Sequence, residues 1–135
     1  MGDIRNFSVG DKAAIKQKVT EQIIGDYADI SGDRNPIHMD TKYAEETVFG
    51  ERIAHGLFCQ ALVSNVIGNK LPGEGAILLT ERINYRKPVY IGDEIECVCE
   101  IKEILSEKNQ CLIAFDCINQ MKECILDGEA LVLLL

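Results

Sequence analysis

Hydrophobic periodicity changes at Gly73 and divides the sequence into two halves of different character. After this point apolar and polar residues alternate with period two, as is typical of half-buried β-strands. The alternation predicts strands over residues 77–86, 94–102, 111–117 and 124–134, separated by turn-like breaks at Gly92-Asp93, Lys108-Asn109 and Met121-Lys122. In the first strand we expect one face to carry Ile77, Leu79, Ile83 and Tyr85. Such short connections favour antiparallel neighbours.

The first half instead shows helical spacing, after a weak strand over residues 12–19. Thr20 is a suitable cap for a helix that should stop near Gly32, and a second short helix begins at Asp40 or Thr41 and reaches Glu46. Residues 57–67 (LFCQALVSNVI) are apolar nearly all round, which predicts a buried helix rather than a surface one. One buried helix beside several antiparallel strands indicates an α+β fold in a single domain over residues 1–135.

The charge and composition exclude some classes of function. The formal net charge is -8, and a surface this acidic repels phosphate backbones, so we expect no nucleic-acid partner. We also expect no membrane association, because no stretch approaches the roughly 20 apolar residues that span a bilayer. The first ten residues lack the apolar core of a secretory signal, so we expect a cytoplasmic protein.

Six cysteines occur without a CxxC pair, and only two histidines are present. Most of the cysteines lie in apolar runs, where a thiol acts as a small hydrophobe. They are Cys59, Cys97, Cys99, Cys111, Cys117 and Cys124. We therefore expect reduced core thiols and no metal site, with a disulfide framework or a metal site as the less favoured alternatives.

Residues 31–40 (SGDRNPIHMD) concentrate the reactive side chains in a short loop that Pro36 prevents from continuing the preceding helix. Asp33 and His38 are five residues apart, a spacing that lets both side chains converge on one water molecule. A carboxylate and an imidazole that share a water can perform acid–base addition. The residues alone equally allow a structural loop, in which Asp33 bonds its own backbone and Asp40 caps the next helix.

A second candidate element is the entry to the buried helix, at His55 and Gly56. The first amides of a helix lack internal partners and lie at the positive end of its dipole, so the Gly56 N–H could donate to a thioester carbonyl. Alternatively, Gly56 only permits close packing, and His55 could compete with His38 as the base. Ser64 lies two turns further along the helix, on the same face as Gly56, and is either a supporting hydroxyl or a buried structural serine.

Taken in order, four segments resemble the MaoC-like dehydratase family, and within it the short bacterial (R)-specific enoyl-CoA hydratases. They are YADISGDRNPIHMD, ERIAHGLF, LPGEGAILL and YRKPVYIGDEI. The resemblance implies a hot-dog fold, in which a long antiparallel sheet wraps a central helix. It also implies a homodimer whose acyl-CoA tunnel is partly formed at the subunit boundary.

The resemblance further implies the roles of individual residues. Asp33 and His38 would form the catalytic dyad with Ser64 in support, while Gly56 and Asn35 would bind the substrate or the developing oxyanion. The expected reaction is reversible hydration of trans-2-enoyl-CoA to (R)-3-hydroxyacyl-CoA, with no cofactor or metal and acyl-CoA as the substrate. From charge alone, the CoA phosphates are expected to meet some of Arg82, Arg86, Lys87 or Lys70. A hot-dog thioesterase and a non-catalytic acyl-CoA-binding module are the alternatives, and carrier-protein thioesters are alternative substrates.

Overall fold

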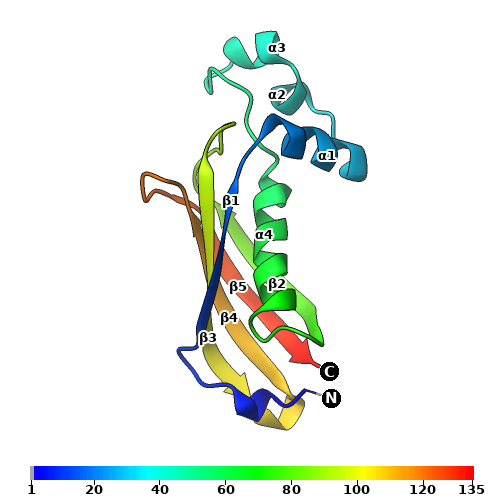
Figure 1. The fold of residues 1–135 in the computed structure, drawn as a ribbon, viewed down its shortest axis with the longest axis vertical. Helices are drawn as coiled ribbons and strands as arrows, with labels where there is room; N and C mark the ends of the chain where they lie inside the picture. The colour runs from blue at the N-terminus through cyan, green and yellow to red at the C-terminus, as the bar shows by residue number, and fades with distance from the viewer. Residues whose placement is uncertain (1) are drawn as a thin grey trace.

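The computed structural model describes residues 2–135, so Met1 of the expected domain lies outside the described residues. Five antiparallel strands form one sheet in the order β1-β3-β4-β5-β2 (Figure 1). The strands are β1 (Lys12–Lys18), β2 (Ala76–Tyr85), β3 (Glu94–Leu105), β4 (Gln110–Ile118) and β5 (Cys124–Leu134). The helices are α1 (Glu21–Ser31), α2 (Pro36–Met39), α3 (Thr41–Glu45) and α4 (Gly56–Asn69), with 3₁₀ turns at Ile4–Asn6 and Ser106–Lys108.

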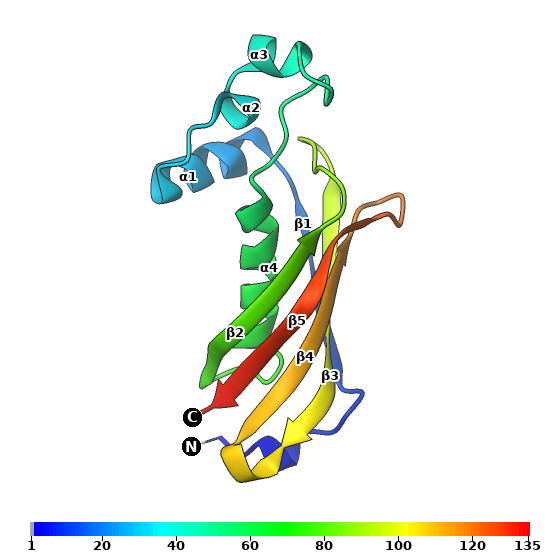
Figure 2. The same cartoon turned by 180° about the vertical axis from the view of Figure 1, so that it is seen from behind.

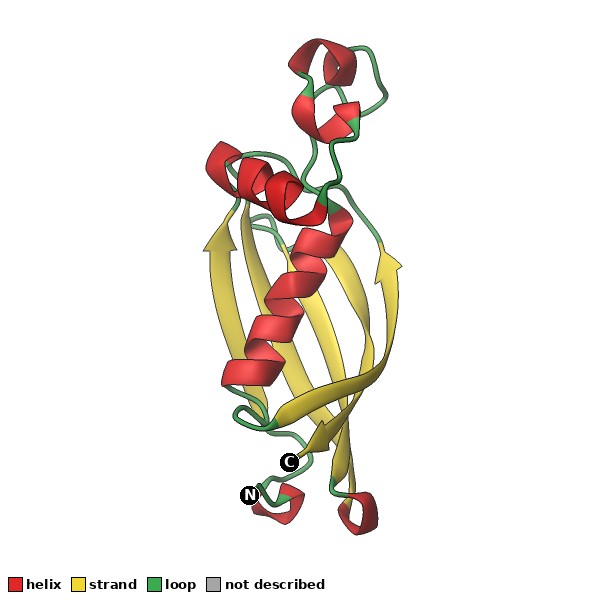
Figure 3. Ribbon diagram, turned by 90° about the vertical axis from the view of Figure 1, so that its right-hand side faces the viewer, coloured by secondary structure: helices red, strands yellow, loops and turns green. Residues whose placement is uncertain are grey.

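The sheet curves around α4, as the side view shows (Figure 3). The core lies between the buried side of α4 and the inner faces of β3, β4 and β5. Cys97, Cys99, Ile113 and Val132 are all 0% exposed there. This arrangement confirms the predicted α+β hot-dog fold and the antiparallel order of the strands.

The predicted complete burial of α4 is wrong on one side of the helix. Cys59, Val63 and Val66 pack into the sheet, but Leu57 is 58% exposed and Ala61 and Ser64 also face outward. The physical reason is that a single curved sheet covers only one side of a helix. An apolar exposed side is the mark of a surface that another molecule can cover.

The predicted face of β2 is also partly wrong, because the strand contains a β-bulge between Leu78 and Thr80. The extra residue shifts the alternation, so Ile77 and Leu79 lie outside at 43% and 44% exposure. After the bulge, Ile83 packs inward against the core as expected. A bulge changes which side chains face the core without changing the sequence periodicity, and it is therefore invisible to a period count.

Two of the six cysteines depart from the expected reduced state. Cys97 and Cys117 lie directly opposite each other on β3 and β4 and form a disulfide, with Cα atoms 4.2 Å apart. Their alternating positions in two different strands gave no sign that the register would pair them. The other four cysteines are free thiols, as expected.

The helices α1, α2 and α3 form an overhang beyond one end of the sheet (Figures 1 and 2). The expected caps are present: Thr20 accepts a bond from the Ile23 amide, and Gly32 ends α1 in the left-handed conformation. Asp40 caps α3 through the Tyr43 amide, as its structural interpretation predicted. From α3 the chain returns through residues 46–55 to the start of α4, so the overhang stands over that helix end.

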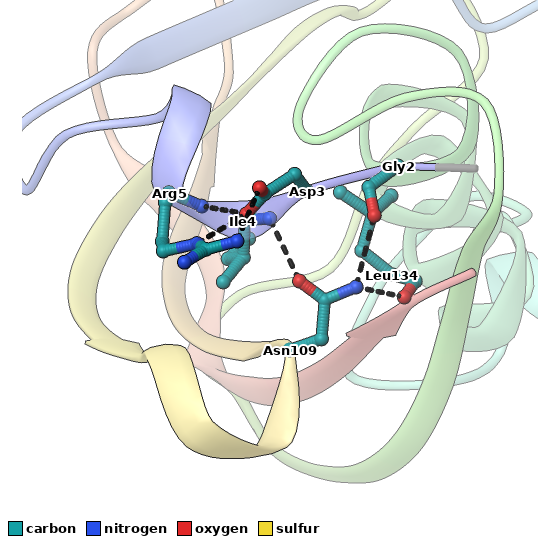
Figure 4. A network of polar contacts seen from close by, with 6 residues as sticks. All are labelled: Gly2, Asp3, Ile4, Arg5, Asn109 and Leu134. Atoms are coloured by element: carbon teal, nitrogen blue, oxygen red, sulfur yellow. Dashed lines mark hydrogen bonds and ion pairs between the residues drawn. The ribbon is translucent and has the colours of Figure 1, made fainter.

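The opposite end of the sheet brings both chain ends together around Asn109 (Figure 4). The Asn109 side chain accepts a hydrogen bond from the Ile4 amide at 2.8 Å and donates to the Gly2 and Leu134 carbonyls. Its backbone is left-handed, with φ at 52°, which Asn tolerates better than most residues. None of the helices within residues 2–135 combines the length and apolar character needed to cross a membrane.

Candidate active site

His38 lies on α2, where the expected loop instead forms one helical turn. Pro36 occupies the first turn, and the Asn35 side chain caps it through the Ile37 amide. The Nδ1 of His38 is 2.7 Å from the Ile53 carbonyl oxygen. Because a carbonyl can only accept, Nδ1 carries the proton and Nε2 keeps its lone pair. The same Ile53 residue donates its own amide to the Ile37 carbonyl, which fixes the imidazole relative to the returning chain.

Burial lowers the pKa of His38 below its ordinary value of 6.5, and repulsion from His55 adds to this effect. The hydrogen bond to Ile53 and the Asp33 charge act in the opposite direction. With only 9% of its surface exposed, His38 therefore stays neutral at neutral pH. A neutral imidazole with a free Nε2 is the form that can accept a proton.

Asp33 forms the expected structural turn and also lies near an imidazole. One carboxylate oxygen accepts a hydrogen bond from the Asn35 amide at 3.1 Å, which is the expected Asx turn. The residue is otherwise exposed. A carboxylate oxygen of Asp33 and one ring nitrogen each of His38 and His55 all lie within 4.8 Å of one another. The predicted convergence of a carboxylate and an imidazole is therefore present in the fold.

His55 belongs to this cluster, although sequence reasoning ranked it only as a competing base. Its ring is 2% exposed and stacks on that of His38, with centroids 4.0 Å apart. Its Nε2 lies 2.9 Å from the Asp33 carbonyl oxygen and donates to it. Its Nδ1 is buried and has no hydrogen-bond partner within residues 2–135. His55 thus fixes the position of the Asp33 backbone through this hydrogen bond. The sequence of His55 and Gly56 alone did not reveal this role.

Gly56 begins α4, and His55 as the cap residue makes no side-chain hydrogen bond to the first turn. The Phe58 amide donates to the His55 carbonyl at 3.0 Å, and the Gly56 amide lies before it at the positive end of the helix. A Cβ added to Gly56 would lie 2.8 Å from Cε1 of Tyr85, so only glycine lets this ring lie against the helix entry. Tyr85 was assigned only to the strand pattern by sequence reasoning, and it forms a wall of the site.

A cavity of about 300 Å³ opens beside these residues. It is mostly apolar and includes the ring of His38. Its lining is His38, Phe49, Ile53, Ala54, Gly56, Cys59, Tyr85, Arg86, Lys87, Pro88, Val89 and Ile125. Burial raises the pKa of the Cys59 thiol to about 12, so Cys59 is a protonated, inert part of the wall rather than a nucleophile.

The four cations suggested for the CoA phosphates separate into two groups. Arg86 and Lys87 line the cavity, and each has a carboxylate partner, Asp127 and Glu123 respectively. Arg82 lies elsewhere on β2 and pairs with Glu129, while Lys70 bonds the Ala14 carbonyl beyond the far end of α4. The structure therefore brings only Arg86 and Lys87 to the cavity.

Three other predicted residues, Asp33, Ser64 and Asn35, lie outside the cavity lining. Ser64 is exposed on the outer side of α4 and is not brought to His38 within this chain. Asn35 is exposed, and its side chain is used as the cap of α2. The clustered ligand groups of Asp33, His38 and His55 lie close enough to hold a metal ion, and each imidazole bonds a backbone carbonyl through only one of its two ring nitrogens. That the reaction needs no metal or cofactor stays a prediction.

The fold and the site together define a hot-dog protein in which an imidazole with a carboxylate nearby and the start of a helix line an apolar cavity. Comparison with known proteins agrees with this class. The model of the family described as "MaoC like domain" matches residues 9–114. This match covers most of the chain, and the chain therefore belongs to the MaoC-like dehydratase family.

Individual relatives are similar over nearly the whole chain. A 3-hydroxybutyryl-CoA dehydratase from Methylorubrum extorquens is 41% identical, covering 94% of this chain and 80% of its own length. An R-hydratase structure from Pseudomonas aeruginosa superposes with a TM-score of 0.92 at 38% identity, covering 98% of this chain and 84% of that one. The (R)-hydratase from A. caviae superposes with a TM-score of 0.93 at 30% identity, covering 97% and 99%.

Proposed function

We propose that this protein catalyses the reversible hydration of trans-2-enoyl-CoA to (R)-3-hydroxyacyl-CoA. The observation that carries the proposal is the convergence of Asp33 on His38, whose ring lines an apolar cavity together with Gly56 at the amide end of α4. Relatives named as a 3-hydroxybutyryl-CoA dehydratase and as (R)-specific enoyl-CoA hydratases support it, at 30–41% identity.

The proposed mechanism uses the chain's own groups. A water held between the Asp33 carboxylate and His38 loses a proton to this pair as its oxygen attacks C3 of the enoyl thioester. The Gly56 N–H donates to the thioester oxygen and stabilises the negative charge that develops there. The pair returns a proton to C2 on the same side, so that one water is added overall. The neutral state of His38, which its lowered pKa favours, suits this role.

Substrate positioning follows from the cavity and its rim. The apolar walls suit an acyl chain, and we propose that Arg86 and Lys87, which line the cavity, bind the CoA phosphates. Binding would exchange their present partners, Asp127 and Glu123, for phosphate oxygens. Asn35 is proposed to act on the substrate only indirectly, by capping the turn that carries His38.

We further propose that the functional form is a homodimer. Two exposed apolar surfaces support it: the outer side of α4 at Leu57, and the edge strand β2 at Ile77 and Leu79. A second subunit over α4 would also cover Ser64, so the proposed supporting role of this serine belongs to the dimer. A cytoplasmic location remains a prediction.

The direct test follows the loss of the enoyl-thioester ultraviolet absorbance with crotonyl-CoA, together with chiral analysis of the product. We expect hydration to the (R)-alcohol by the wild type and a rate about 10²–10⁴-fold lower for Asp33→Asn. The matched control is Asp26→Asn, on the exposed side of α1, which should keep the wild-type rate. An unchanged rate in Asp33→Asn would refute the dyad, whereas release of free thiol without hydration would indicate a thioesterase.

A further inference from the structure

Glu81 is a half-buried carboxylate that the proposed mechanism does not use. It follows the bulge in β2 and pairs in register with Ala130, which is 1% exposed, so its side chain is on the inner face of the sheet. Its Oε2 accepts a hydrogen bond from Nε2 of Gln60 on α4 at 2.8 Å. Its Oε1 is buried and has no hydrogen-bond partner among residues 2–135.

This hydrogen bond joins α4 to β2 next to the residues of both elements that line the cavity. On α4 the cavity is lined by Gly56 and Cys59, and Gln60 is the next residue. On β2 the cavity is lined by Tyr85, and Glu81 lies four residues earlier on the same face. The Gln60–Glu81 bond therefore joins α4 to β2 where the cavity lining ends on both elements.

The pKa values of Glu81 and of its neighbour Tyr85 are consistent with a carboxyl that is partly shielded from water. Burial raises the pKa of Glu81, and the bond from Gln60 only partly opposes that shift. Burial also raises the pKa of Tyr85, and the charges of Cys59 and Glu81 add to this effect. The Glu81 carboxyl has exchanged water for a single amide partner, and its Oε1 has none among the described residues. The Gln60–Glu81 pair is therefore a polar barrier between α4 and β2.

Resting on the hydratase function proposed above, we propose that the Gln60–Glu81 pair is a polar stop that limits the substrate to short acyl chains. Gln60 lies four residues beyond Gly56, which is about 6 Å along the helix axis. A zigzag carbon chain advances about 1.25 Å per bond, so a four-carbon chain extends about 4 Å past the carbonyl carbon and an eight-carbon chain about 9 Å. The four-carbon chain ends before the pair, while the longer chain must break the bond and leave both polar groups without partners.

The test compares kcat/KM for crotonyl-CoA and trans-2-octenoyl-CoA within each variant, because a ratio of substrates cancels any loss of folded enzyme. For the wild type we expect octenoyl-CoA to be at least about 10-fold poorer than crotonyl-CoA. In the double variant Gln60→Ala/Glu81→Ala the ratio should rise by about 10-fold or more in favour of octenoyl-CoA, mainly through a lower KM. Glu81→Gln, which keeps the size and bonding of the side chain, should preserve the wild-type ratio.

Thr80→Ala is the matched control, because Thr80 is the adjacent residue on β2 and is exposed. It should leave the substrate ratio unchanged. A wild type that accepts octenoyl-CoA as well as crotonyl-CoA, or a double variant with the wild-type ratio, overturns the polar stop while the hydratase function stands. If the wild type hydrates no enoyl-CoA of either length, both proposals are overturned.

Discussion

The imidazole rings of His38 and His55 stack with their centroids 4.0 Å apart and their planes inclined by 28°. Each ring donates from one nitrogen to a backbone carbonyl, His38 to Ile53 and His55 to Asp33. The two bonds fix the tautomer of each ring and join two chain segments, residues 33–38 and residues 53–55. The stack thus sets the geometry of the Asp33–His38 pair before any substrate binds, which is how an enzyme reduces the cost of orienting its catalytic groups.

Replacing the base itself should remove most of the activity. We expect His38→Gln to lower kcat for crotonyl-CoA hydration by about 10²–10⁴-fold, because glutamine lacks the basic Nε2 lone pair that would share the proton of the water with Asp33. KM should change little, since His38 forms only a small part of the cavity lining. Steady-state kinetics separates the two parameters, and a variant with full kcat would exclude His38 as the base.

His55 should act through the position of Asp33 and through the pKa of His38. His55→Phe keeps a ring in the stack but removes the bond to the Asp33 carbonyl, and we expect kcat to fall by up to about 10²-fold. The variant also removes a repulsion that lowers the pKa of His38, so that pKa should rise. A merely structural role for His55 would change the rate without moving the pH profile.

The pH profile follows from the neutral state that the base needs. Burial lowers the pKa of His38, so the wild type should keep its hydration rate as the pH falls to 6.5 and lose it only below that value. In His55→Phe the pH at which the hydration rate falls should be higher, because the repulsion that lowers the pKa of His38 is gone. A kcat/KM profile across the acid range measures this pH for both proteins, and a wild-type value above 6.5 would contradict the assignment.

Gly56 should tolerate no side chain while Tyr85 is present. A Cβ at Gly56 would lie 2.8 Å from the Tyr85 ring, so Gly56→Ala should displace the ring or the helix entry and sharply lower kcat/KM. The backbone N–H is unchanged by this substitution, which makes the cause steric. The double variant Gly56→Ala/Tyr85→Ala should therefore recover part of the loss relative to the product of the two single effects. Strictly additive effects would show that the clash is not the cause.

Sequence reasoning predicted most of the fold because local signals and tertiary structure agree in most elements. Thr20 and Asp40 cap helices where expected, and the alternation in β3 and β4 gave the buried positions correctly. The bulge in β2 escaped detection because it depends on pairing with β5, which has no local signature. The Cys97–Cys117 disulfide depends likewise on the register between two strands.

The site was predicted only as far as its residues lie close in sequence. Asp33 and His38 share one loop segment, so their convergence was foreseeable from spacing. The contributions of Ile53, His55 and Tyr85 come from segments that meet only in the folded chain. The contact between Gln60 and Glu81 was invisible for the same reason. Each residue interrupts an apolar pattern in its own element, but nothing in the sequence pairs the two.

Asn109 should contribute to stability far from the site, because it joins both chain ends (Figure 4). Asn109→Ala removes three hydrogen bonds of about 1 kcal/mol each and places alanine in a left-handed conformation, so we expect a loss of about 3–4 kcal/mol in the free energy of unfolding. Asn109→Gly loses the same bonds but tolerates the positive φ, and should be about 1 kcal/mol more stable than the alanine variant. Urea denaturation of the three proteins measures both differences. Equal stability of the alanine and glycine variants would show that the left-handed backbone carries no cost, whereas wild-type stability in both would show that the side-chain bonds contribute nothing.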